Sequence, residues 1–105
     1  MAGDSRFAAD GVVVEEEVRF TLVELCRACG AEQALVVSLV DEGVLEPAGN
    51  RPEEWLFSGT ALARARAALR LAHDLDVGVA GAALVLDLLD QIELLRARLR
   101  RAGIR

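Results

Sequence analysis

The spacing of apolar residues is most regular from Val79 to Arg101. Apolar residues recur there at intervals of three and four: Val85, Leu88, Ile92, Leu95 and Leu99. This spacing predicts a long helix with one continuous apolar stripe. A second set widens the apolar surface near the start of the helix: Ala82, Leu86 and Leu89. Because so wide a surface needs cover from more than one side, we expect the first half to pack on its own domain and the second half to meet a partner helix.

Two short helices are predicted before this long one. The sequence Thr21-Leu-Val-Glu24 is a capping box, in which the threonine hydroxyl and the glutamate side chain each take up a free amide. A helix should therefore run from Leu22 to Cys29, with Gly30 as the left-handed residue after it. A second helix is expected from Glu32 to Asp41 or Glu42, before Gly43. Helix, glycine turn and helix is the pattern of a helix-turn-helix unit.

The next segment favours a winged form of that unit. We expect two short strands, Val44–Glu46 and Trp55–Phe57, joined by a connector with two prolines and a Gly-Asn pair. Ser58 is then the cap of a third helix, Gly59–Asp74. A further short strand is expected to end at Phe20. The predicted fold is mainly α, a winged helix-turn-helix with a small β-hairpin wing and a long C-terminal dimerisation helix.

Length and composition bound the domain organisation. A chain of 105 residues that is 53% hydrophobic and 28% charged suits one globular domain. We expect residues 1–14 to be a disordered extension, 15–75 to form the winged domain with its third helix, and 76–105 to form the long helix. No apolar run reaches the roughly 20 residues of a membrane span. The N-terminus lacks the pattern of a signal peptide, so we expect a cytoplasmic protein with no membrane partner.

Charge divides the chain into two halves. Residues 1–54 contain 12 acidic and 4 basic residues, whereas residues 55–105 contain 5 acidic and 8 basic residues. The second predicted helix contains three acidic residues and no basic one: Glu32, Asp41 and Glu42. A helix that enters a DNA groove normally brings Arg or Lys to the phosphates. We therefore expect no direct, specific DNA binding, and interpret this helix as facing a protein.

The candidate chemical groups do not form an active site. Cys26 and Cys29 lie at the end of a predicted helix, where the helix dipole disfavours a thiolate, and His73 is too distant to complete a zinc set. We expect inert, packed cysteines and a structural role for His73 at the hinge between helices. The acids Asp87, Asp90 and Glu93 are expected on a solvated helix face. The prediction is a protein that is not an enzyme and that has no cofactor or metal.

Five segments, in order, resemble the CbpM chaperone-modulator family, which belongs to the wider MerR-like winged helix-turn-helix group. They are Phe20–Cys26, Gly43–Pro47, Glu54–Phe57, Arg70–Leu75 and Gly81–Ile92. The resemblance covers about residues 18 to 101. It implies a protein that binds the J-domain of a DnaJ-like co-chaperone of the CbpA type and inhibits its stimulation of the Hsp70 partner DnaK. The alternatives are a MerR-like dimeric DNA-binding transcription regulator and a plain dimerising scaffold.

Two sets of residues are candidates for binding. The partner-binding set is acidic with one aromatic residue: Glu32, Asp41, Glu42, Glu53, Glu54 and Trp55. Trp55 has two interpretations, since it can cover the core from the wing or anchor an interface. The dimerisation set is Val85, Leu88, Ile92, Leu95 and Leu99. Because the long helix is acidic early and basic late, we expect two copies to pair antiparallel.

Overall fold

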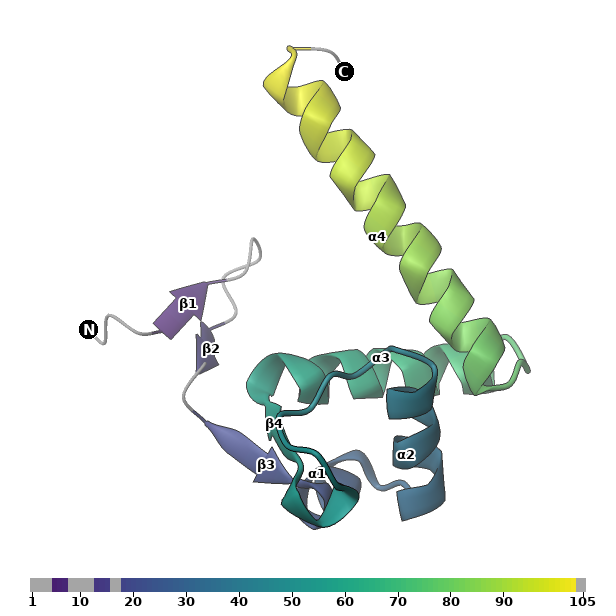
Figure 1. Ribbon diagram of the computed structural model, residues 1–105. Helices are drawn as coiled ribbons and strands as arrows, with labels where there is room; N and C mark the ends of the chain where they lie inside the picture. Colours follow the sequence, from purple (N-terminus) through teal and green to yellow (C-terminus); the bar gives the residue numbers. More distant parts are fainter. Residues whose placement is uncertain (1–4, 8–12, 16–17, 104–105) are drawn as a thin grey trace.

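Four helices build most of the part of the chain that the structure describes. The computed structural model describes residues 5–7, 13–15 and 18–103, the first two segments by their backbone only. The helices are α1 (Leu22–Cys29), α2 (Gln33–Asp41), α3 (Gly59–Asp74) and α4 (Val79–Arg101), with a short 3-10 turn η1 (Pro52–Glu54). In Figure 1, α1, α2 and α3 cluster together, and α4 extends away from them to the C-terminus. The mainly helical fold with a long C-terminal helix confirms the predicted class.

The ends of α1 follow directly from the sequence. The Glu24 amide donates to the Thr21 hydroxyl at 3.1 Å, and the Thr21 amide donates to Glu24 Oε1 at 2.9 Å. At the other end Gly30 has φ 66°, a left-handed conformation that glycine adopts without steric cost. The Ala31 amide then donates to the Cys26 carbonyl at 3.0 Å, so α2 begins after only a tight turn. The capping box and the glycine turn are both confirmed.

The core lies where α1, α2 and α3 meet. Its largest fully buried side chains are Phe57, Leu25, Leu39 and Val36. Two small residues of α3, Ala65 and Ala68, are also fully buried, which lets the other helices approach that helix closely. The first turns of α4 join this core through Ala82 and Leu86. As expected, the start of α4 packs on its own domain.

The predicted pairing of the wing strands is wrong. The strand β4 (Leu56–Ser58) exists, but it pairs antiparallel with β3 (Arg19–Thr21), placing Phe20 opposite Phe57. Val44–Glu46 is not a strand, because the Val44 and Leu45 amides both turn back to the Leu39 carbonyl at the end of α2. The two side chains are buried in the core instead. The wing connector is closed by a single bridge between Ala48 and Leu56.

One glycine shapes this connector. Gly49 has φ 112°, and a Cβ at this position would lie 2.7 Å from the Glu54 carbonyl oxygen. A larger residue would therefore push the chain away from η1. The glycine allows the connector to fold tightly against the acidic turn at Glu53 and Glu54.

The first residues of the chain contain a further strand pair. β1 (Ser5–Phe7) pairs antiparallel with β2 (Val13–Glu15). The rest of the 1–14 extension, which we expect to be disordered, lies outside the described residues, so that expectation stays a prediction. Across the part of the chain that the structure describes, no helix is long and apolar enough to cross a membrane.

The turn between α3 and α4 is held by the backbone. The Leu75 amide donates to the Leu71 carbonyl at 2.9 Å and the Val77 amide to the Ala72 carbonyl at 3.0 Å. Asp76 adopts φ 54°, a conformation that aspartate tolerates better than most residues. The His73 side chain is 90% exposed, and among residues 18–103 its one polar side-chain contact is with its neighbour Asp74, at 3.3 Å. The side chain of His73 is thus not what holds the hinge, but the His73 carbonyl accepts the Asp76 amide at 3.3 Å.

Candidate protein-interaction surfaces

The predicted acidic residues lie at the two ends of α2. Glu32 immediately precedes the helix, while Asp41 and Glu42 lie at its C-terminal end, about 13 Å away at 1.5 Å per residue. Glu53 of η1 shares a surface cavity with Gln33, so it lies beside the first turn of α2. All four carboxylates are exposed. We call these residues, with Glu54, the acidic surface.

Glu54 and Trp55 have partners inside the protein. The Arg51 guanidinium contacts the Glu54 carboxylate at 2.8 Å, and both side chains are exposed, so this pair contributes little to stability. It does offset the charge of Glu54. The Trp55 ring packs edge-on against Phe57, with ring centroids 6.0 Å apart and planes at 83°. The structure thus shows Trp55 covering the core, and its role as an interface anchor stays a prediction.

The far half of α4 carries an exposed apolar stripe. Leu88, Ile92, Leu95 and Leu99 are 54%, 44%, 52% and 44% exposed. We call these four residues the distal stripe. Val85, the fifth predicted dimerisation residue, is half-buried. Because Ala82 and Leu86 face the core, the distal stripe lies on the other side of the helix. Further exposed leucines, Leu84 and Leu89, widen it.

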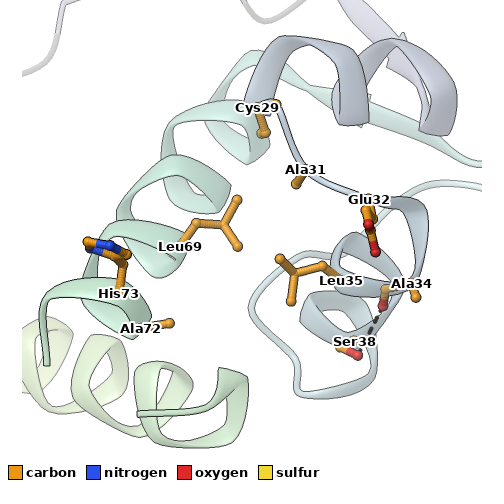
Figure 2. A pocket seen from close by; sticks show the side chains of 10 residues that line it. Cys29, Ala31, Glu32, Ala34, Leu35, Ser38, Leu69, Ala72 and His73 are labelled. Atoms are coloured by element: carbon orange, nitrogen blue, oxygen red, sulfur yellow. Dashed lines mark hydrogen bonds between the residues drawn. The ribbon is translucent and has the colours of Figure 1, made fainter. Parts of the chain in front are cut away.

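A groove of about 680 Å³ opens between α2 and α3. Its walls are largely apolar: Ala31, Ala34, Leu35, Leu69 and Ala72. Figure 2 shows Leu35 and Leu69 pointing toward one another across it, with Cys29 at the end formed by α1. The sequence pattern did not reveal this groove, because Leu35 fits the apolar repeat of the second helix. In the structure Leu35 is 38% exposed.

Arg64 joins three parts of the molecule on another face. Its Nε donates to the Val44 carbonyl at 3.2 Å, and its NH1 lies 3.4 Å from Asp90 of α4. These contacts tie α3 to the loop after α2 and to the middle of α4. Asp90 is therefore part of an internal contact and is not simply a solvated acid. The sequence offered no signal for this long-range pair.

The two cysteines pack against the core. Burial raises the pKa of the Cys26 thiol, and burial also raises the pKa of the Cys29 thiol although the nearby Arg66 charge acts in the opposite direction. The raised pKa disfavours the thiolate form of both cysteines at neutral pH. In the stretches that the structure describes, no three His, Cys, Asp or Glu side chains are grouped to hold a metal ion.

Comparison with known proteins identifies the family to which this chain belongs. Residues 20–102 match the family model of the MerR HTH family regulatory proteins, so the class is a MerR-like helix-turn-helix protein. The chaperone modulatory protein CbpM of Coxiella burnetii (strain Dugway 5J108-111) is 34% identical over 90 residues, 86% of this chain and 85% of that protein. CbpM of Pseudomonas putida (strain W619) is 38% identical over 80 residues, 76% of this chain and 79% of that protein. The chain belongs to the CbpM family of chaperone modulatory proteins.

Proposed function

We propose that this protein modulates a chaperone system by binding the J-domain of a DnaJ-like co-chaperone of the CbpA type. Binding blocks the stimulation of the Hsp70 partner DnaK. The names of the relatives describe chaperone modulators, and the observation that carries the finer proposal is the acidic surface. Three of its acids, Glu32, Asp41 and Glu42, lie at the ends of α2, the helix that a DNA-binding protein of this class would present to DNA.

The charge of α2 favours a basic protein surface over DNA. Glu32, Asp41 and Glu42 are exposed at its ends, and no residue of the helix is basic. J-domains resemble one another in a basic second helix, which is also the surface that DnaK uses. Complementary charge raises the association rate and selects the partner, and an acidic competitor at that helix excludes DnaK by occlusion.

We further propose that the protein acts as a homodimer through the distal stripe of α4. Four exposed apolar side chains in an alternating three and four spacing have the pattern of a two-helix seam. A second copy fits this seam by charge as well, because α4 is acidic at Asp87 and Asp90 and basic at Arg98 and Arg101. Antiparallel pairing brings opposite charges together, and apolar burial supplies most of the stability.

The test of J-domain binding uses the isolated J-domain of the host's CbpA-type co-chaperone and calorimetry. The double reversal Asp41→Arg with Glu42→Arg should cost about 1–3 kcal/mol of affinity, and binding of the unaltered protein should weaken as salt rises. In the same series, the unaltered protein should lower the J-domain-stimulated ATPase activity of DnaK, and the reversed protein should not.

The control is Asp74→Arg, an exposed reversal at the end of α3. It should leave both affinity and inhibition unchanged, and the melting temperatures of all variants should agree closely. Equal binding of the J-domain by the reversed and unaltered proteins at low salt would place the contact elsewhere. If no J-domain of the host binds at all, the dimerising scaffold becomes the better interpretation.

A further inference from the structure

The groove between α2 and α3 has a different character from the acidic surface. Its floor and walls carry two leucines that point toward each other from different helices, Leu35 and Leu69 (Figure 2). Leu35 is exposed although it stands within an apolar repeat. An apolar trough between two helices is the kind of surface that takes the apolar face of a third helix.

The α2 wall of the groove is almost neutral. The Ser38 hydroxyl donates to the Ala34 carbonyl at 3.0 Å, so its donor is engaged within the helix. Glu32, which also belongs to the acidic surface, is the one charged group on this wall among the residues that line the groove. This wall therefore offers mainly apolar contact.

Two arginines of α3, Arg66 and Arg70, flank the groove, although neither lines it. Arg66 and Arg70 are four residues apart, so they lie on one face of α3, and His73 continues that face to the groove lining. The Arg66 guanidinium donates to the Ala28 carbonyl at 3.3 Å, which places it at the α1 end of the groove beside Cys29. No side chain within residues 18–103 forms an ion pair with Arg70.

We infer that this groove binds an amphipathic helix of a protein partner, with apolar residues on Leu35 and Leu69 and an acidic flank against Arg66 and Arg70. The charge selects the orientation of the helix, since an acidic flank on the α3 side gains two cationic contacts. A basic flank there meets repulsion. The proposal does not depend on J-domain binding, because the acidic surface requires a basic partner and the groove an acidic one.

The probe is a fluorescein-labelled synthetic peptide with leucines at positions i, i+3, i+4 and i+7 and glutamates along one flank. A second peptide has lysine in place of each glutamate. Fluorescence anisotropy at low salt should show micromolar binding of the glutamate peptide and at least tenfold weaker binding of the lysine peptide. Amide chemical shifts should move at Leu35, Leu69 and Ala72.

Two variants test the groove residues themselves. Leu35→Gln removes an exposed apolar contact, and Arg70→Glu reverses an exposed charge, so neither should disturb the core. Each should weaken the glutamate peptide about tenfold or more. Matched controls are Val23→Gln on α1, which is 56% exposed, and Arg101→Glu at the end of α4. Both controls should bind the peptide like the unaltered protein.

Several results would overturn the proposal. The lysine peptide binding as well as the glutamate peptide would remove the role of Arg66 and Arg70. Chemical shifts confined to other surfaces, or none up to millimolar peptide, would show that the groove takes no helix. Groove signals that shift with the protein's own concentration would identify a second copy as the occupant. J-domain affinity measured with Leu35→Gln and Arg70→Glu separates this site from the acidic surface, since it should not change.

Discussion

Cys26 and Cys29 close the last turn of α1, and both side chains pack against the core. Burial disfavours the charged thiolate, so the pKa of each thiol lies above its ordinary value. At neutral pH the folded protein should therefore alkylate several-fold more slowly than the unfolded chain. The measurement is iodoacetamide labelling followed by mass spectrometry, in buffer and in denaturant, from neutral to alkaline pH.

The sign of the linked stability follows from the same shift. An acid whose folded pKa is raised keeps its proton longer in the folded state, so stability is full below the ordinary cysteine pKa. The stability falls as the pH rises from the ordinary cysteine pKa toward the raised pKa of the folded protein. Rapid labelling of the folded protein at neutral pH, equal to that in denaturant, would contradict the burial argument. It would also reopen a redox role for the C-x-x-C pair.

At the scale of elements, α4 divides into a half that belongs to the core and a half that does not. Leu95→Glu places a charge in the middle of the distal stripe and should convert a homodimer to a monomer, because a buried unpaired carboxylate is costly. Leu94→Glu is the matched control. Leu94 is 44% exposed but lies about 100° around the helix from Leu95. Light scattering distinguishes the variants, and an unaltered protein that is monomeric at tens of micromolar would refute the dimer.

The direction of pairing can be tested with one pair of charges. Asp87 and Arg98 are eleven residues apart, about three turns, and so lie on the same flank of α4. If the stripe is centred on Ile92, antiparallel pairing brings Asp87 of one copy to within about 1.5 Å of the level of Arg98 of the other. Asp87→Arg and Arg98→Asp should each weaken the dimer, and the double variant should recover about 0.2–1 kcal/mol.

Parallel pairing predicts a different outcome of this cycle. It sets Asp87 level with Asp87 of the second copy and about 16 Å along the axis from Arg98 of that copy, so Arg98→Asp would not rescue Asp87→Arg. Sedimentation equilibrium at low salt is the suitable measurement, since exposed charge pairs are screened as salt rises. The pair lies beside the distal stripe and leaves its leucines intact, so apolar burial is the same in all four proteins.

The elements that local sequence determines were predicted closely, and those that depend on distant contacts were not. The Thr21–Glu24 capping box and Gly30 act within a few residues, so the limits of α1 could be inferred without the fold. The partner of β4 could not, because Phe20 and Phe57 are far apart in the chain and meet only through the core. The two apolar residues Val44 and Leu45 are compatible with a short strand and equally with a buried loop, so the sequence could not decide between them.

The candidate surfaces show the same division. The acids of α2 and the apolar stripe of α4 are visible in the sequence as charge and spacing. The groove requires Leu35 of α2 to face Leu69 of α3, and Asp90 contacts Arg64 of another helix. Neither contact has a local signal, since both depend on how the helices cross.

At the scale of the whole molecule, the acidic surface and the basic end of α4 lie apart. The acidic surface lies at α2 and η1, whereas the basic end of α4 projects away from the helical cluster (Figure 1). A dimer joined by α4 would therefore hold two acidic surfaces apart from each other. Such an arrangement suits a binder of two basic protein partners better than a reader of one duplex.

The last prediction concerns DNA, because the alternative function of this fold is transcriptional regulation. α2 has no basic residue to place against a backbone with one negative charge per roughly 1.7 Å, so no duplex should bind in a sequence-specific way. Low salt is the most permissive condition for a gel-shift titration. Any weak binding seen there should come from the arginines at the end of α4 and should be lost in Arg98→Glu with Arg101→Glu. Sub-micromolar binding to a defined operator, retained in that double variant, would favour a regulator over a chaperone modulator.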